Sequence, residues 1–204
     1  MVHQECTNPD AQLASLMQPL EALREKGCVA SANGRSECDR LRVDIERLAL
    51  VCPGHAPTLM ANAVFAYEEH RPIKAQQYLD ELLSQPGSHA DAAALRARIA
   101  VEEGNLNFAR RLLTTQIRMA PNHAGLHETL GAALYLAGQL DEAARELGAA
   151  SALGAPRWRI AYHLGLIEEA AGRVTNALSY YNESNAAHPG WPPVEARIRA
   201  LSKN

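Results

Sequence analysis

The stretch that determines the fold runs over residues 123–156, HAGLHETLGAALYLAGQLDEAARELGAASALGAP. Its apolar residues recur at helical spacing on both sides of Gly138, which predicts two amphipathic helices joined by a tight turn. The pattern returns after about 34 residues, a period typical of stacked helical hairpins. A shift forward places Gly138 on Gly172, and a shift back places it on Gly104. The chain is therefore predicted to be a repeat protein.

A small residue marks the second helix of each repeat in the same frame. Ala143 falls on Ala177 one period forward and on Ala109 one period back, and Ala75 holds the position one period earlier still. In that earliest repeat His70 replaces the turn glycine. Proline is poorly tolerated inside a helix but suits the start of the next one. The prolines that precede, close or nearly close the repeats are Pro53, Pro86, Pro121, Pro156 and Pro189.

The composition fits closely stacked helices. Hydrophobic residues make up 47% of the 204 residues but aromatic residues only 5%, so the apolar content is chiefly Ala and Leu. The formal net charge is −3 and the basic residues are scattered, which argues against nucleic-acid binding. No apolar run approaches the roughly 20 residues that span a bilayer. No secretory signal is visible at the amino terminus.

The first 54 residues are predicted to form an antiparallel helical hairpin, with one helix starting at Pro9 and a second over residues 37–51. All the cysteines of the chain lie here: Cys6, Cys28, Cys38 and Cys52. A hairpin brings the second and third cysteines together at its loop and the first and fourth at its open end. Of three connectivities we therefore predict Cys28–Cys38 and Cys6–Cys52. A zinc site is one alternative, although close C-x₂₋₄-C pairs are missing. Four free thiols are another.

The sequence is predicted to divide into three parts. Residues 1–54 form the N-terminal hairpin, residues 55–189 form four repeats, and residues 190–204 form a charged helix that caps the last repeat. The repeats are expected at about residues 56–89, 90–123, 124–157 and 158–189.

The repeats resemble the tetratricopeptide repeat (TPR) family, which has a small residue in the first helix, a turn glycine, an alanine in the second helix and a terminal proline. The third and fourth repeats carry all of these, at Gly131, Gly138, Ala143 and Pro156 and at Gly165, Gly172, Ala177 and Pro189. The second repeat has Ala97 for the packing glycine, and the first departs most. The resemblance implies an all-α, right-handed TPR solenoid of antiparallel helix pairs, in which residues 37–53 could belong to a degenerate earlier repeat.

In proteins with this resemblance, the first helices of successive repeats line a concave groove that binds a peptide or an amphipathic helix. The lining expected here is apolar and rich in tyrosine, which usually marks a contact surface. The alternative is that N-terminal helices fold back into the groove. The family's groove positions give as candidate binding residues Met60, Val64, Tyr67, Arg98, Glu128, Tyr135, Leu136, Arg159, Tyr162 and Leu166.

One TPR subfamily is disfavoured. TPR co-chaperones hold the terminal carboxylate of heat-shock chaperones with lysine, asparagine and arginine at defined groove positions. In this sequence those positions are occupied by Met60, Val64, Ala94, Arg98 and Ala132. The carboxylate clamp is therefore missing, and a co-chaperone role is not expected.

No pattern of catalytic residues stands out. A phosphate-binding loop after a strand and a nucleophile elbow are both missing. His123 and His127 lie four residues apart with Glu128 beside them, but a third metal ligand is not evident. Adjacent acids such as Glu168 and Glu169 point about 100° apart on a helix, so they do not face each other. We predict no catalytic residues, no metal and no cofactor.

The predicted function is that of a protein-binding scaffold rather than an enzyme. The confined cysteines favour an oxidising, extracytoplasmic compartment such as a bacterial periplasm. There the resemblance suggests assembly of envelope, pilus or secretion complexes, with a lipid anchor or leader that has been removed. The alternatives are a cytosolic chaperone or regulator of a secreted partner, and an interaction module of a larger protein. The sequence does not specify an oligomeric state.

Overall fold

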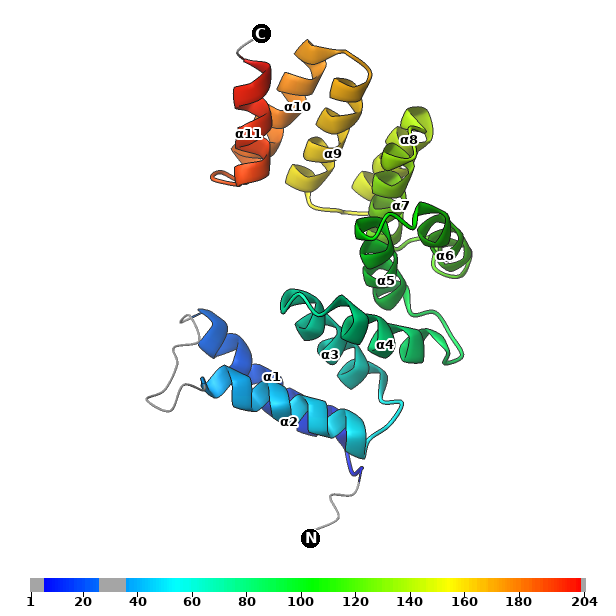
Figure 1. The fold of residues 1–204 in the computed structure, drawn as a ribbon, viewed down its shortest axis with the longest axis vertical. Helices are drawn as coiled ribbons and strands as arrows, with labels where there is room; N and C mark the ends of the chain where they lie inside the picture. Colours follow the sequence, from blue (N-terminus) through cyan, green and yellow to red (C-terminus); the bar gives the residue numbers. More distant parts are fainter. Residues whose placement is uncertain (1–5, 26–35, 203–204) are drawn as a thin grey trace. The chain divides into compact units, whose positions relative to one another are not determined.

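The computed structural model describes residues 6–25 and 36–202. Within these ranges the chain forms eleven α-helices and no β-strand, which confirms the all-α prediction (Figure 1). The chain divides into two compact units, Met1–Gly87 and Ser88–Asn204. None of the described helices is long and apolar enough to cross a bilayer.

The first unit consists of two helical hairpins. In chain order these are α1 (Pro9–Glu25) with α2 (Glu37–Val51), and α3 (Ala56–Glu68) with α4 (Pro72–Leu83). Ser36 starts α2 with a reciprocal pair of hydrogen bonds. Its hydroxyl accepts from the Asp39 N–H at 3.1 Å, and its own N–H donates to the Asp39 carboxylate at 2.9 Å. Two of the backbone donors at the start of the helix are thereby satisfied.

A disulfide closes the open end of the first hairpin. Cys6 and Cys52 are bonded, as predicted, with their Cα atoms 5.0 Å apart. Cys38 is also disulfide-bonded. Its predicted partner, Cys28, lies outside the described residues. The start of α1 and the end of α2 are therefore linked by a covalent bond.

One apolar core joins the first hairpin to the second. Leu20 of α1, Ile45 of α2 and Phe65 of α3 are buried in it. Arg42 of α2 lies over the Phe65 ring, 5.6 Å from its centroid, and pairs with Glu69 at 3.1 Å. Because α3 packs on both α1 and α2, the first hairpin contacts the second as one repeat contacts the next.

The second unit contains three hairpins and a final helix. In chain order these are α5 (Ala90–Glu102) with α6 (Leu106–Met119), α7 (Ala124–Leu136) with α8 (Leu140–Ala152), α9 (Arg157–Ala170) with α10 (Val174–Ala187), and then α11 (Pro192–Leu201). The first helices also contact one another, α5 with α7 and α7 with α9. They form one layer of the unit, and α6, α8 and α10 form the other (Figure 1).

The repeated glycines lie in the turns between paired helices. Gly104, Gly138 and Gly172 have φ angles of 78°, 75° and 75°. Glycine populates this left-handed region without the steric cost that a Cβ imposes. His70 adopts φ 56° at the same place in the first unit. The sequence period therefore reflects a turn geometry that each hairpin repeats.

The final helix covers the apolar end of the last hairpin, as predicted. Val194 of α11 is fully buried with Ala177 and Tyr181 of α10. Glu169, near the end of α9, accepts a hydrogen bond from the Tyr181 hydroxyl at 2.6 Å and pairs with Arg197 of α11 at 3.1 Å. One carboxylate thus connects three helices.

Candidate binding surface

Seven of the ten candidate residues lie on the layer formed by α5, α7 and α9. Their spacing along each helix places them on one stripe. With His163, which follows the same stripe, they form what we call the first-helix face, comprising Arg98, Glu128, Tyr135, Leu136, Arg159, Tyr162, His163 and Leu166. The other three candidates, Met60, Val64 and Tyr67, are half-buried on α3 of the first unit.

A buried carboxylate lies within the first-helix face. The Glu128 side chain is only 7% exposed, and its Oε2 accepts a hydrogen bond from Nη2 of Arg159 at 2.6 Å. Nε2 of His163 lies 3.9 Å from the other carboxylate oxygen. Glu128 therefore ties α7 to α9 and holds Arg159 in place, because an unpaired buried carboxylate would be costly. The buried Nε of Arg159 has no hydrogen-bond partner.

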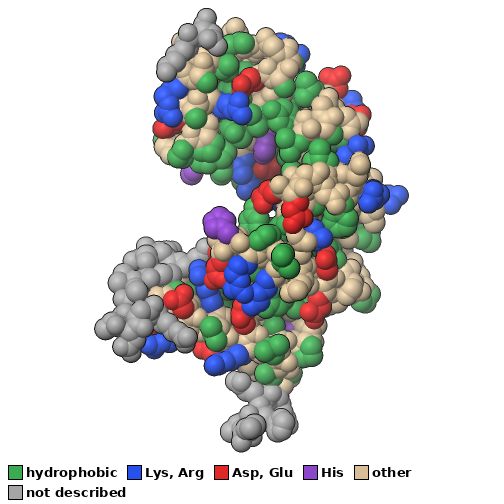
Figure 2. All heavy atoms as spheres, viewed as in Figure 1, with side chains coloured by type: hydrophobic (Ala, Val, Ile, Leu, Met, Phe, Trp, Pro, Cys, Tyr) green, Lys and Arg blue, Asp and Glu red, His purple; other side chains and the backbone are tan. Residues whose placement is uncertain are grey.

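Burial and nearby positive charge favour the neutral form of the His163 imidazole. Burial is the main cause that lowers the pKa of His163 below its ordinary 6.5. Glu128 acts in the opposite direction, whereas the positive charges of Arg159 and Arg98 lower the pKa further. The influence of Arg98 also shows that this residue of α5 belongs to the same electrostatic neighbourhood. Figure 2 shows one side of the second unit, on which hydrophobic side chains surround a group of histidine, basic and acidic side chains.

We expect His163 to make the second unit less stable in mild acid. Between pH 6.5 and the lowered folded-state pKa, the unfolded chain binds a proton that the folded chain does not. The free energy of unfolding should then fall as pH falls, by up to about 1.4 kcal/mol per pH unit. Urea unfolding followed by tryptophan fluorescence at several pH values measures this slope. His163→Gln should reduce the slope and His70→Asn, in an exposed turn of the first unit, should not. Equal slopes in wild type and His163→Gln would contradict the assignment.

The apolar candidates differ in exposure and in what packs against them. Leu136 is 54% exposed and Tyr135 beside it is half-buried. Tyr162 and Leu166 instead pack against the core under α11, and the Tyr162 ring meets the Trp191 ring edge-on at 4.6 Å. The most exposed apolar candidate is therefore Leu136 at the end of α7, whereas Tyr162 and Leu166 support the final helix.

Two residues of this region were not predicted from the sequence. His163 lies four residues after Arg159, so helical spacing could have indicated it. Trp191 lies outside the repeat frame, and nothing in the sequence period indicates its contact with Tyr162.

The two histidines with metal-like spacing are occupied by protein groups. His123 caps α7 by accepting the Leu126 N–H at 3.3 Å, and its Nε2 lies 3.0 Å from Asp91. Nδ1 of His127 lies 2.7 Å from Glu146. The described residues contain no group of three or more His, Cys, Asp or Glu side chains arranged to hold a metal ion.

Similarity to known proteins is found at the level of structure. No protein-family model matches this sequence, and no curated protein matches it. TTC0263, a TPR protein of Thermus thermophilus, is 19% identical, with a TM-score of 0.75 over 94% of this chain and 100% of that one. A TPR protein from Parabacteroides merdae is 16% identical, with a TM-score of 0.72 over 94% of this chain and 71% of that one.

The chain has the TPR fold. The match to TTC0263 covers 94% of the chain and so has to include the N-terminal hairpin. The first TPR of Spaghetti (RPAP3), solved with the HSP90 peptide SRMEEVD, is also similar, with 14% identity and a TM-score of 0.51 over 58% of this chain and 97% of that one. The predicted TPR resemblance is therefore confirmed for the fold.

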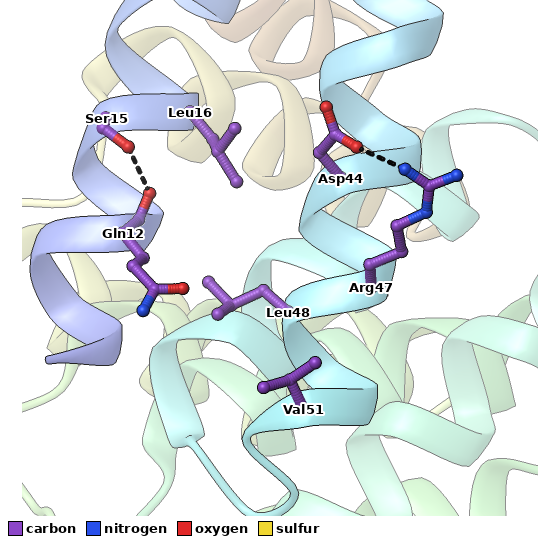
Figure 3. Close-up of a pocket in the computed structure, with 7 residues that line it drawn as sticks. All are labelled: Gln12, Ser15, Leu16, Asp44, Arg47, Leu48 and Val51. Atoms are coloured by element: carbon purple, nitrogen blue, oxygen red, sulfur yellow. Dashed lines mark hydrogen bonds and ion pairs between the residues drawn. The ribbon is translucent and has the colours of Figure 1, made fainter. Parts of the chain in front are cut away.

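A pocket in the first hairpin of this TPR fold lies outside the first-helix face. It has a volume of about 380 Å³ and lies between α1 and α2, where Leu16 and Leu48 point toward each other (Figure 3). Its polar groups have partners close by: Arg47 pairs with Asp44 at 3.0 Å, and the Ser15 hydroxyl donates to a backbone carbonyl at 2.7 Å. The lining mixes four polar side chains with three apolar ones and does not resemble a reactive site.

Proposed function

We propose that this protein is a non-enzymatic TPR scaffold that binds a peptide or an amphipathic helix of a partner protein on its first-helix face. The observation that carries the proposal is the exposed Leu136 with the half-buried Tyr135, on the same face as the fixed Glu128–Arg159 pair. Exposed apolar side chains next to ordered polar groups are typical of protein contact sites. Arg98 forms no ion pair with an acid in the described part of the chain, so it is available to a partner.

The TPR fold supports this use of the surface. The similar TPR of Spaghetti holds a peptide. In the present chain Glu128 and Arg159 fix the spacing of α7 and α9 before any partner arrives, and preorganisation of this kind lowers the entropic cost of binding. For the first unit, Met60, Val64 and Tyr67 stay predicted contacts of the same kind.

We further propose an extracytoplasmic scaffold that assembles cell-envelope, pilus or secretion complexes. The Cys6–Cys52 disulfide supports this compartment, because disulfides persist in oxidising environments and are rare in the cytosol. A role in the assembly of protein complexes requires only that partner proteins bind. A helical surface can do this without a catalytic group.

The test replaces Tyr135 and Leu136. Partners are first captured from the native host with the wild-type protein and identified, and one partner is then purified. Tyr135→Ala combined with Leu136→Ala should weaken its Kd at least about tenfold, because truncated contact residues of this kind cost more than about 1.4 kcal/mol. Tyr162→Ala is unsuitable because its ring supports α11.

The matched control removes apolar surface elsewhere. Leu50 of α2 and Met119 of α6 are 82% and 51% exposed and lie outside the first-helix face. Leu50→Ala combined with Met119→Ala should leave the Kd unchanged. If the control variant and the Tyr135→Ala, Leu136→Ala variant bind equally well, the partner uses another surface.

A further inference from the structure

The outer helix α6 carries a cluster of basic side chains that the first-helix face does not use. Its sequence, LNFARRLLTTQIRM, holds three arginines and no acidic residue, in a chain whose formal net charge is −3. Arg110, Thr114 and Arg118 follow one another at four-residue intervals and so share one side of the helix. Arg111 and Thr115 lie beside them. The basic charge of α6 is therefore concentrated on one surface.

These side chains line a shallow pocket of about 410 Å³, which we call the α6 pocket. Every lining side chain is polar, and all of them can donate hydrogen bonds. They are Asn107, Arg110, Arg111, Thr114, Thr115 and Arg118. The α6 pocket therefore holds three guanidinium groups, one amide and two hydroxyls, without a carboxylate to neutralise them.

The described acidic neighbours form no ion pair with the arginines of the α6 pocket. An adjoining pocket shares Arg110 and Arg118 and adds Arg145, Glu142 and Glu146. The Oε2 of Glu146 lies 2.7 Å from Nδ1 of His127, and Glu142 accepts a hydrogen bond from the neutral Gln139 amide at 3.1 Å. Within the described residues no ion pair is formed by the arginines of α6 or by Arg145.

We propose that the α6 pocket binds a phosphate group. A guanidinium fork matches the oxygen atoms of a phosphate with paired, charge-assisted hydrogen bonds. The threonine hydroxyls and the Asn107 amide supply further donors at the same place. Neighbouring positive charges that form no ion pair repel one another, and a bound anion relieves that repulsion.

The lining distinguishes this ligand chemistry from a protein partner. Protein interfaces have an apolar core, whereas no apolar side chain lines the α6 pocket. The phosphate could belong to a soluble compound or to a lipid headgroup, because both present the same oxygen atoms. The α6 pocket is formed by the second-helix layer, so the proposal does not depend on the first-helix face.

Two arms of one experiment separate these sources, using the full chain. In the first, inorganic pyrophosphate is titrated into the protein and backbone amide shifts of α6 are followed by NMR. In the second, the protein is sedimented with vesicles of phosphatidylcholine containing phosphatidylglycerol, and with vesicles of phosphatidylcholine alone. We expect binding in at least one arm, and we expect it to weaken as salt is raised.

Arg111→Gln combined with Arg118→Gln should weaken binding at least about tenfold, since each guanidinium contributes charge-assisted hydrogen bonds. Both side chains are exposed, so helix content should stay unchanged by circular dichroism. The control is Arg157→Gln combined with Arg199→Gln, which removes the same charge from side chains paired with Glu183 and Glu195. The control should bind like the wild type.

Pyrophosphate binding that the α6 variant loses assigns the pocket to soluble phosphates. Binding only to the phosphatidylglycerol vesicles, lost in the same variant, assigns it to a lipid headgroup. Absence of binding in both arms, or an equal loss in the α6 variant and the control, overturns the proposal.

Discussion

Gly165→Ala is expected to destabilise the second unit by about 3 kcal/mol, at the upper end of the cost of overpacking a core. A Cβ at this position would lie 2.5 Å from Cε1 and 2.6 Å from Cδ1 of Tyr181. That ring is fully buried, and its hydroxyl donates to Glu169 at 2.6 Å. Burial, and next the hydrogen bond to Glu169, raise the pKa of Tyr181 far above its ordinary value, so the hydroxyl keeps its proton. The ring therefore cannot move aside without giving up this bond.

Urea unfolding followed by tryptophan fluorescence measures the loss, because both tryptophans, Trp158 and Trp191, lie in the second unit. The matched control is Gly148→Ala, also inside a helix. No atom lies within 4 Å of its new Cβ. This control should stabilise the unit by roughly 0.5–1 kcal/mol, because glycine is a poor helix former. Similar free energies of unfolding for Gly165→Ala and Gly148→Ala would show that the close packing of α9 on α10 is not required.

Removal of the Cys6–Cys52 disulfide is expected to cost the first unit roughly 4 kcal/mol, because the bond spans a sequence separation of 46 residues and restricts the unfolded chain. Cys6→Ala combined with Cys52→Ala tests this, since alanine leaves no polar atom in the buried site of Cys52. Far-UV circular dichroism during urea unfolding should show an earlier transition.

The tryptophan signal supplies the internal control for this variant. Because the first unit contains no tryptophan, the fluorescence transition of the second unit should stay unchanged. A shift of both transitions would mean that the two units unfold together, and no shift in either would mean that the disulfide does not stabilise the fold. Protein from its native host should resist alkylation at these cysteines until it is reduced, and ready alkylation would contradict the proposed compartment.

Local features of the fold could be predicted from the sequence. The turn glycines are visible because a left-handed φ is a property of one residue and its neighbours, so Gly104, Gly138 and Gly172 repeat wherever the turn repeats. The Cys6–Cys52 bond was predictable for a similar reason. Antiparallel helices joined by a short loop bring their far ends together, whatever packs around them.

Which residues of the first-helix face are buried could not be predicted in the same way. Glu128 was expected to line the groove, yet it is buried because Arg159 and His163 of the next repeat close over it. Tyr162 and Leu166 share the predicted stripe, but the final helix covers them. In each case the deciding contact comes from another helix pair or from α11, and helical spacing gives no information about which element packs on top.

For the α6 arginines as well, the sequence gives their positions along the helix, and the tertiary structure decides their surroundings. Counted along the chain, the basic residues are scattered, which argues against nucleic-acid binding. Helix geometry gathers Arg110, Arg111 and Arg118 on one side, and only the tertiary structure shows that Glu142 and Glu146, which line the adjoining pocket, form hydrogen bonds with other residues.

The sequence by itself therefore determined the repeat, its turns, its small packing residues and the end-to-end cysteine pair, because each depends on neighbours in the chain or within one hairpin. The tertiary structure decided which of the stripe residues remain accessible and which charges remain unpaired. Accessibility and charge pairing depend on the surface that an adjacent repeat buries and on the counter-ion that it supplies, and these are set by packing between helices that are distant in the sequence.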